Sequence, residues 1–277
     1  MLKKLETDPE VVRSVWSWRG EIGSMKYQSF PEVKSRVMRI LALLLVAVVS
    51  ACGGGNDAPD LIEPPAWEAR NLASGTWAVM GSSTAAGAGA TFGKGWADLL
   101  QLDFAGSATG LGNIAKGGAV TYEGLSVSAT PLQERPLPDP AANIDRALSL
   151  DPVLLLVSYP SNDTGVGYAA DETVNNILAI RTLALAHSVP VIVLSSQPRN
   201  DFSAAKLAKL VQIDERLASA VGPCFVAVRS LLADGGGKLA AQYSYDGVHP
   251  NDEGHLLIAT QVRALLESGS CVILPAG

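Results

Sequence analysis

The chain has 277 residues, of which 48% are hydrophobic and 17% charged, and its formal net charge is −6. The aliphatic runs and the lack of a glycine period exclude a collagen-like or disordered chain, and no short unit repeats as it would in a solenoid or propeller. The negative charge has the wrong sign for binding a phosphate backbone, so we expect no nucleic-acid partner.

A short aliphatic stretch precedes the body of the chain. Residues 40–49 are ten aliphatic residues that follow three basic ones. This run is too short to span a bilayer, which needs about 20 apolar residues, but it has the size and flanks of a signal-peptide core. We therefore expect residues 1–51 to be a signal-peptide region, with the true start at Met38 or Met25.

Small residues lead directly to Cys52, and three glycines follow it. This pattern resembles the bacterial lipobox, in which the cysteine is diacylated and becomes the new N-terminus. The alternative is an ordinary secretory signal cleaved near a cysteine. The resemblance implies a lipid anchor on Cys52, a flexible tether over residues 52–75 and a lipoprotein of the cell envelope. The outer membrane is favoured because no aspartate follows the cysteine.

The two other cysteines, Cys224 and Cys271, form an even pair in an exported protein. A disulfide between them is permitted, and two unpaired thiols are the alternative. No Cys-x-x-Cys motif or Cys/His cluster occurs, so we expect no structural zinc. We also expect no other metal or organic cofactor.

From residue 76 onward, short apolar runs alternate with segments of helical spacing. The apolar runs predict strands at 77–80, 111–114, 152–159, 190–196 and 225–228. The helical spacing and capping residues predict helices at 95–104, 171–188, 203–221 and 253–266. Strands that are apolar on both faces and alternate with helices indicate a parallel sheet between two helical layers. We therefore expect one α/β domain over residues 76–277.

Residues able to do chemistry follow several of these strands, where such sheets bind ligands. Ser82 and Ser83 stand among small residues after the first strand, Gly118 follows the second and Asn162 the third. Glycine lets backbone N–H groups approach a ligand closely, and an amide side chain can donate to an oxyanion or simply close a turn. No Lys-Ser or Lys-Thr pair follows the first glycines, so a phosphate loop is not indicated.

A carboxylate and an imidazole stand three residues apart before the last predicted helix. On a loop, this spacing lets Asp246 accept from Nδ1 of His249, which leaves Nε2 free as a base. The two other histidines are expected in structural roles, His187 at a helix end and His255 within the last helix. After the fourth strand, Arg199 is a candidate for holding a substrate anion, although a loop arginine is more often solvated.

Four sequence blocks therefore follow one another over residues 76–267: those of Ser82–Ser83, of Gly118, of Asn162 and of Asp246 with His249. In this order they resemble the blocks of the SGNH (GDSL-type) hydrolase superfamily. The resemblance implies a flavodoxin-like three-layer α/β/α sandwich with a central parallel sheet. It also implies Ser83 as nucleophile, His249 as general base and acid, and Asp246 as the carboxylate that orients the imidazole.

The resemblance further implies an oxyanion hole made of the backbone N–H groups of Ser83 and Gly118 and the side-chain amide of Asn162. Two positions depart from the family pattern. Ser82 takes the place of the first block's aspartate, so Ser82 is an alternative nucleophile, and a Pro-Ser pair replaces the usual Gly-x before Asn162.

The activity implied is that of a serine esterase or acylhydrolase that cleaves carboxylic esters through an acyl-enzyme. The sequence has no long apolar lid segment, which favours short acyl groups or acyl groups on glycans. We expect a monomer attached to the membrane only through Cys52. The alternative is a catalytically inactive, glycan-binding lipoprotein of the same fold, for which Ser82 is the main support.

Overall fold

The computed structural model describes residues 72, 74–104, 110–159 and 161–271. These residues lie in the compact unit that extends from Leu61 to Gly277. The predicted signal-peptide region, the predicted lipidation site at Cys52 and most of the predicted tether lie outside the described residues. Within the described ranges, no helix is long and apolar enough to cross a bilayer.

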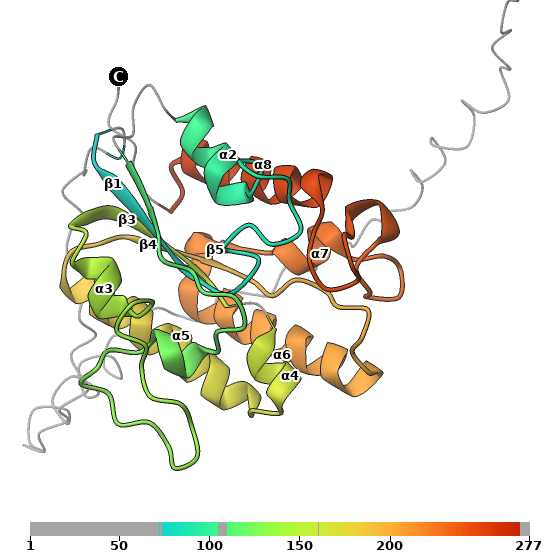
Figure 1. Cartoon of the computed structure of the whole chain (residues 1–277), viewed down its shortest axis with the longest axis horizontal. Helices are drawn as coiled ribbons and strands as arrows, with labels where there is room; N and C mark the ends of the chain where they lie inside the picture. The colour runs from blue at the N-terminus through green and yellow to red at the C-terminus, as the bar shows by residue number, and fades with distance from the viewer. Residues whose placement is uncertain (1–71, 73, 105–109, 160, 272–277) are drawn as a thin grey trace, which may run out of the picture. The chain divides into compact units, whose positions relative to one another are not determined.

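A five-stranded parallel sheet forms the centre of the fold (Figure 1). The strands are β1 (Thr76–Gly81), β2 (Gly110–Asn113), β3 (Pro152–Ser158), β4 (Val191–Leu194) and β5 (Phe225–Val226). Their order is β2-β1-β3-β4-β5, and every neighbouring pair is parallel. The order reverses at β1, so the carboxyl ends of β1 and β3 flank the point where such sheets bind ligands.

Helices cover both faces of the sheet, as predicted (Figure 1). One layer contains α2 (Trp96–Asp103), α7 (Val228–Leu232) and α8 (Asp252–Ser268). The other contains α3 (Ile144–Leu148), α4 (Asn162–Val166), α5 (Ala170–Ala186) and α6 (Ala204–Val221). The fold is therefore the three-layer α/β/α sandwich that the resemblance implies.

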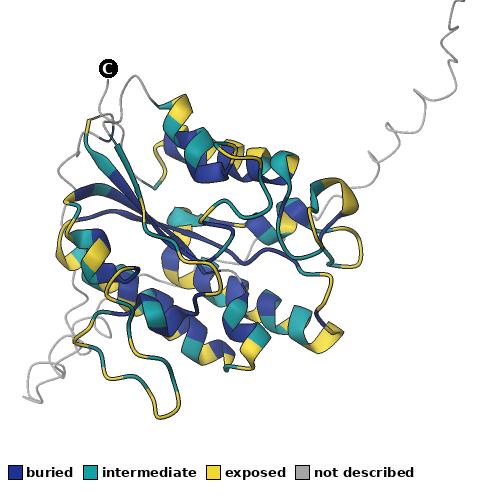
Figure 2. Ribbon diagram, in the orientation of Figure 1, coloured by how far each residue is buried: buried dark blue, intermediate teal, exposed yellow. Residues whose placement is uncertain are grey.

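Strand β3 shows why the apolar runs are continuous. Leu154 and Leu156 pack against the α2, α7 and α8 layer, whereas Leu155 and Val157 pack against the opposite layer. All four side chains are fully buried, and β3 is mostly dark blue in Figure 2, whereas the edge strand β2 is intermediate to exposed. A strand with helices on both sides has no polar face, so its sequence does not alternate.

One predicted strand is wrong at its end. The strand expected over 225–228 stops at Val226, and α7 begins at Val228. The backbone N–H of Arg229 donates to Oγ of Ser195, and Val228 packs into the same core cluster as Val226. A short apolar run has the same appearance in a strand and in a buried helical turn, so only the packing distinguishes them.

A disulfide joins Cys224, just before β5, to Cys271, just after α8. The sequence left this pairing open, and the structure contains it. The bond closes a loop of 47 residues that includes α7, α8 and the loop between them. It therefore restrains the segment that carries Asp246 and His249.

Candidate active site

The turn after β1 positions two adjacent serines at the carboxyl edge of the sheet. Gly81 has φ +151°, and a Cβ there would lie 1.9 Å from the carbonyl oxygen of Ser158, so a side chain does not fit. The backbone N–H of Ser82 donates to this same oxygen, 3.0 Å away. This contact with β3 fixes the direction in which the next residue leaves the strand.

The two serines have different surroundings. Ser82 is buried, and its Oγ has no hydrogen-bond partner among the described residues. Ser83 is half-buried, and its Oγ lies 3.0 Å from Nε2 of His249. Of the two candidate nucleophiles, only Ser83 is therefore within hydrogen-bond reach of a base.

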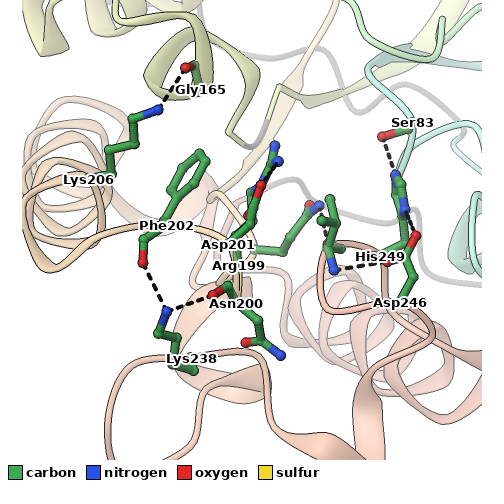
Figure 3. Close-up of polar contacts among 12 residues, drawn as sticks. Ser83, Gly165, Arg199, Asn200, Asp201, Phe202, Lys206, Lys238, Asp246 and His249 are labelled. Atoms are coloured by element: carbon green, nitrogen blue, oxygen red, sulfur yellow. Dashed lines mark hydrogen bonds and ion pairs between the residues drawn. The ribbon is translucent and has the colours of Figure 1, made fainter.

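The loop before α8 holds the base and the carboxylate that the spacing predicts (Figure 3). Oδ2 of Asp246 accepts from Nδ1 of His249 at 2.8 Å. Oδ1 of Asp246 accepts from the backbone N–H groups of Val248 and His249 at 2.9 and 2.8 Å. Because Nδ1 donates to Asp246, Nε2 of the neutral imidazole can accept the hydroxyl proton of Ser83.

The same contacts keep Asp246 ionised. Partial burial raises the pKa of the carboxyl group, but the hydrogen bonds from the His249 ring and from the two backbone N–H groups outweigh burial and lower the pKa to about 2. An ionised carboxylate holds the imidazole in one tautomer and stabilises its protonated form. Asp246 therefore has the charge that an orienting residue needs throughout the neutral range.

The turn after β1 and the loop that carries His249 are in close contact at Gly89. This glycine has φ +92°, and a Cβ on it would lie 2.2 Å from the carbonyl oxygen of Pro250 and 2.9 Å from Cβ of His249. The buried His255 supports the same contact from α8, since its Nδ1 accepts from the N–H of Trp96 and its Nε2 donates to the carbonyl of Ala88. Burial lowers the pKa of His255, which matches this neutral, structural role.

Two further blocks supply candidate oxyanion donors. Gly118 lies exposed after β2 with φ +79°, and Asn162 opens α4 after β3. Nδ2 of Asn162 donates to the carbonyl of Ala119 at 2.9 Å, which holds the amide beside Gly118 and leaves its second N–H for a ligand. Within the part of the chain that the structure describes, the backbone N–H groups of Ser83 and Gly118 also have no acceptor.

A buried carboxylate that sequence reasoning did not single out connects these two blocks. Asp163 accepts from the backbone N–H and Oγ1 of Thr121, at 2.9 and 2.5 Å, and from Oγ1 of Thr173 at 3.1 Å. Burial raises the pKa of Asp163, and these hydrogen bonds oppose that change. Asp163 thus fixes the block that carries Gly118 against the one that carries Asn162.

Gln197, after β4, is a second residue that the sequence did not reveal. Its buried amide accepts from Oγ1 of Thr84 at 2.8 Å and donates to the carbonyl of Val248 at 3.0 Å. The amide therefore bridges the residue after Ser83 and the residue before His249. No sequence signal marks such a role, because both partners are distant in the chain.

For the ester hydrolysis that the family resemblance implies, we expect Gln197→Leu to lower kcat about 10- to 100-fold, because Ser83 and His249 would lose a common support and their alignment. The matched control is Gln242→Leu on the exposed surface. Steady-state kinetics and melting temperatures of both variants would test this. Equal kcat values in the two variants would contradict a positioning role for Gln197.

A Ser–His–Asp series at the carboxyl edge of a parallel sheet, inside a three-layer α/β/α fold, defines a hydrolase of the SGNH class. Residues 79–257 match the model of the GDSL-like lipase/acylhydrolase family, and the chain belongs to this family. Members of this family act on ester bonds. Within the described residues, no group of three or more His, Cys, Asp or Glu side chains is arranged to hold a metal ion.

Solved structures of this class have the same fold at low sequence identity. A member of the lipolytic protein G-D-S-L family from Veillonella parvula has a TM-score of 0.51 at 16% identity, over 69% of this chain and 98% of that one. The psychrotrophic esterase EstA from Pseudoalteromonas has a TM-score of 0.50 at 14% identity, over 70% and 97%. No curated protein matches this chain in sequence.

Proposed function

We propose that this protein is a serine esterase that hydrolyses carboxylic esters through an acyl-enzyme. The observation that carries the proposal is the hydrogen-bonded series from Ser83 Oγ through the His249 ring to Asp246, with distances of 3.0 and 2.8 Å. Membership of an acylhydrolase family supports the same reaction class.

The proposed reaction has two halves. In the first, Ser83 Oγ bonds to the ester carbonyl carbon while its proton passes to Nε2 of His249, and the N–H groups of Ser83, Gly118 and Asn162 bind the oxyanion. His249 then protonates the leaving alcohol as the ester C–O bond breaks. In the second half, water gives its proton to His249 and attacks the acyl group, and the proton returns to Ser83 as the acid is released.

The substrate class we propose is a short acyl ester or an acyl group on a glycan. The cavity beside Gly118 and Asn162 is lined by charged side chains as well as Phe202 and Val166, which is unsuited to a long alkyl chain. Hydrolysis of 4-nitrophenyl acetate, butyrate and octanoate by the full chain would test this, with the fastest turnover expected for the shortest esters.

A chemical probe distinguishes the proposed esterase from the inactive, glycan-binding alternative. A fluorophosphonate bonds covalently to an activated serine whether or not the substrate is known. Labelling at Ser83, located by peptide mapping, supports the esterase. A chain that neither labels nor hydrolyses any of the three esters would favour the binding protein, with Ser82 in place of the family's aspartate as its mark.

We also propose that the protein is an exported lipoprotein anchored through Cys52, on the outer membrane. The sequence pattern before Cys52 supports the anchor, and the Cys224–Cys271 disulfide suits an oxidising compartment outside the cytoplasm. We expect Cys52→Ala to move the protein from the membrane pellet to the soluble fraction of a bacterial host. A variant that still pellets with membranes would contradict the anchor.

A further inference from the structure

A cavity of about 290 Å³ opens beside the proposed oxyanion hole. Its lining includes Gly118 and Asn162 of the proposed oxyanion hole together with Arg199, Phe202 and Lys206. A group bonded to the ester centre that points away from His249 would enter this space. Arg199, Phe202 and Lys206 therefore bear on which esters the site accepts.

Arg199 is held in one orientation at this cavity. Its Nε and one terminal nitrogen donate to the two carboxylate oxygens of Asp201, at 2.9 and 2.6 Å, and the guanidinium carbon lies 4.4 Å from the ring centre of Phe202. The side chain is only 15% exposed. Within the described residues its other terminal nitrogen, Nη1, has no acceptor, so its N–H groups are available to a ligand.

Lys206 presents a second cation on the other side of the Phe202 ring. Its Nζ donates to the carbonyl of Gly165 at 2.9 Å and lies 5.1 Å from the ring centre. That bond uses one of three ammonium N–H groups. Since Asp201 balances Arg199, Lys206 leaves the cavity with a net positive charge in a chain whose own net charge is −6.

The segment that follows Arg199 is hydrogen-bonded to the loop that carries His249. Nζ of Lys238 donates to the carbonyl groups of Asn200 and Phe202, at 2.7 and 2.9 Å. The N–H of Asn200 donates to the carbonyl of Gly247, in the loop between Asp246 and His249, at 2.7 Å. Figure 3 shows this segment and the Ser83–His249–Asp246 series in one view. The cavity is thus attached to the base loop by a network of hydrogen bonds.

From these observations we infer that the cavity is a subsite for a carboxylate carried by the ester substrate, bound by the free N–H groups of Arg199 and attracted by the positive charge of Lys206. A charged donor facing a carboxylate in a partly desolvated site forms a stronger hydrogen bond than a neutral one, and a guanidinium matches the carboxylate in shape. The carboxylate belongs either to the acyl part, as in a dicarboxylic monoester, or to the alcohol part, as in an acylated uronic acid. This inference rests on the proposed esterase function.

Two pairs of esters that differ only in charge test the inference with the full chain. Mono-4-nitrophenyl adipate against its methyl ester places the carboxylate on the acyl part. 4-Acetoxybenzoate against methyl 4-acetoxybenzoate places it on the alcohol part. We expect kcat/KM to favour the charged member of one pair by about tenfold, and added salt to reduce that preference. The pair that shows the preference identifies the part of the substrate that enters the cavity.

The variant Lys206→Gln removes the charge while keeping a donor, and Lys209→Gln is the matched control. Lys209 lies on the same helix, and its Nζ likewise donates to a backbone carbonyl, that of Tyr168, at 3.0 Å, but it does not line the cavity. We expect the preference for the charged ester to fall several-fold in Lys206→Gln and to persist in Lys209→Gln.

Each outcome bears on one of the two proposals. Turnover of the neutral esters without a preference for either charged one overturns the carboxylate subsite and leaves the esterase proposal standing. An equal loss of preference in both lysine variants also overturns the subsite, since it would reflect overall charge. If none of the four esters is hydrolysed, the esterase proposal fails, and the subsite that rests on it fails too.

Discussion

Ser83→Ala is expected to lower kcat for 4-nitrophenyl acetate by at least about 10⁴-fold, because the hydroxyl that lies 3.0 Å from Nε2 of His249 would be gone. The residual rate would come from binding and from the remaining oxyanion donors. Single-turnover kinetics and the loss of fluorophosphonate labelling would measure the effect. Circular dichroism would establish that the fold is retained.

The neighbouring serine provides a control one residue away. Ser82→Ala removes a buried hydroxyl that has no partner among the described residues, so we expect kcat within a few-fold of the unaltered protein and no loss of stability. Near-normal turnover in Ser83→Ala together with inactivity in Ser82→Ala would reverse the assignment. That result would require the turn after β1 to present its hydroxyls in another register.

Asn162→Ala is expected to lower kcat about 10²- to 10³-fold with a smaller change in KM, because a side-chain donor to an oxyanion acts mainly in the transition state. The structure prepares this donor, since the carbonyl of Ala119 holds one of the amide N–H groups and leaves the other. Initial rates over a range of ester concentrations would separate the effects on kcat and KM.

Asn162→Asp places a negative charge where the amide N–H groups were, and it also loses the hydrogen bond to the carbonyl of Ala119. The aspartate has nearly the same volume but offers no N–H, and when ionised it would repel an oxyanion. We therefore expect it to lose at least as much activity as Asn162→Ala. If Asn162→Asp retained most of the activity, turnover would need neither the amide donor nor its bond to Ala119, and the oxyanion hole would consist of backbone donors alone.

Short-range patterns in the sequence predicted many features of this protein. The β3 segment is continuously apolar, as a strand buried on both faces is, and Ser203 and Asn251 are the N-caps of α6 and α8. The three-residue spacing of Asp246 and His249 also defines their pairing, because both residues lie on one short loop. The strand expected over 225–228 was wrong because a run of four apolar residues does not distinguish a strand from a buried helical turn.

The sequence did not predict contacts between segments that are far apart in the chain. Asp163 meets Thr121 across 42 positions of the chain, and Gln197 joins Thr84 to Val248. Many aspartate and glutamine side chains make no such contacts, so the residue types of Asp163 and Gln197 did not indicate these roles. Their roles depend on how β1, β3 and β4 lie side by side, which follows from the order of the strands and not from any local pattern.

The choice between Ser82 and Ser83 shows most directly what the sequence determines and what only the folded structure determines. The sequence alone established a parallel α/β fold and a loop carboxylate–imidazole pair, because both depend on periodicity and short-range spacing. The family resemblance favoured Ser83 as the nucleophile, but the residues alone left Ser82 as an alternative, because the two adjacent hydroxyls have the same chemistry. The separation comes from Gly81, whose close contact with Ser158 turns Ser82 into the core and Ser83 toward His249, 166 residues away. The direction in which each hydroxyl points depends on the packing of the strands, which exists only in the folded chain.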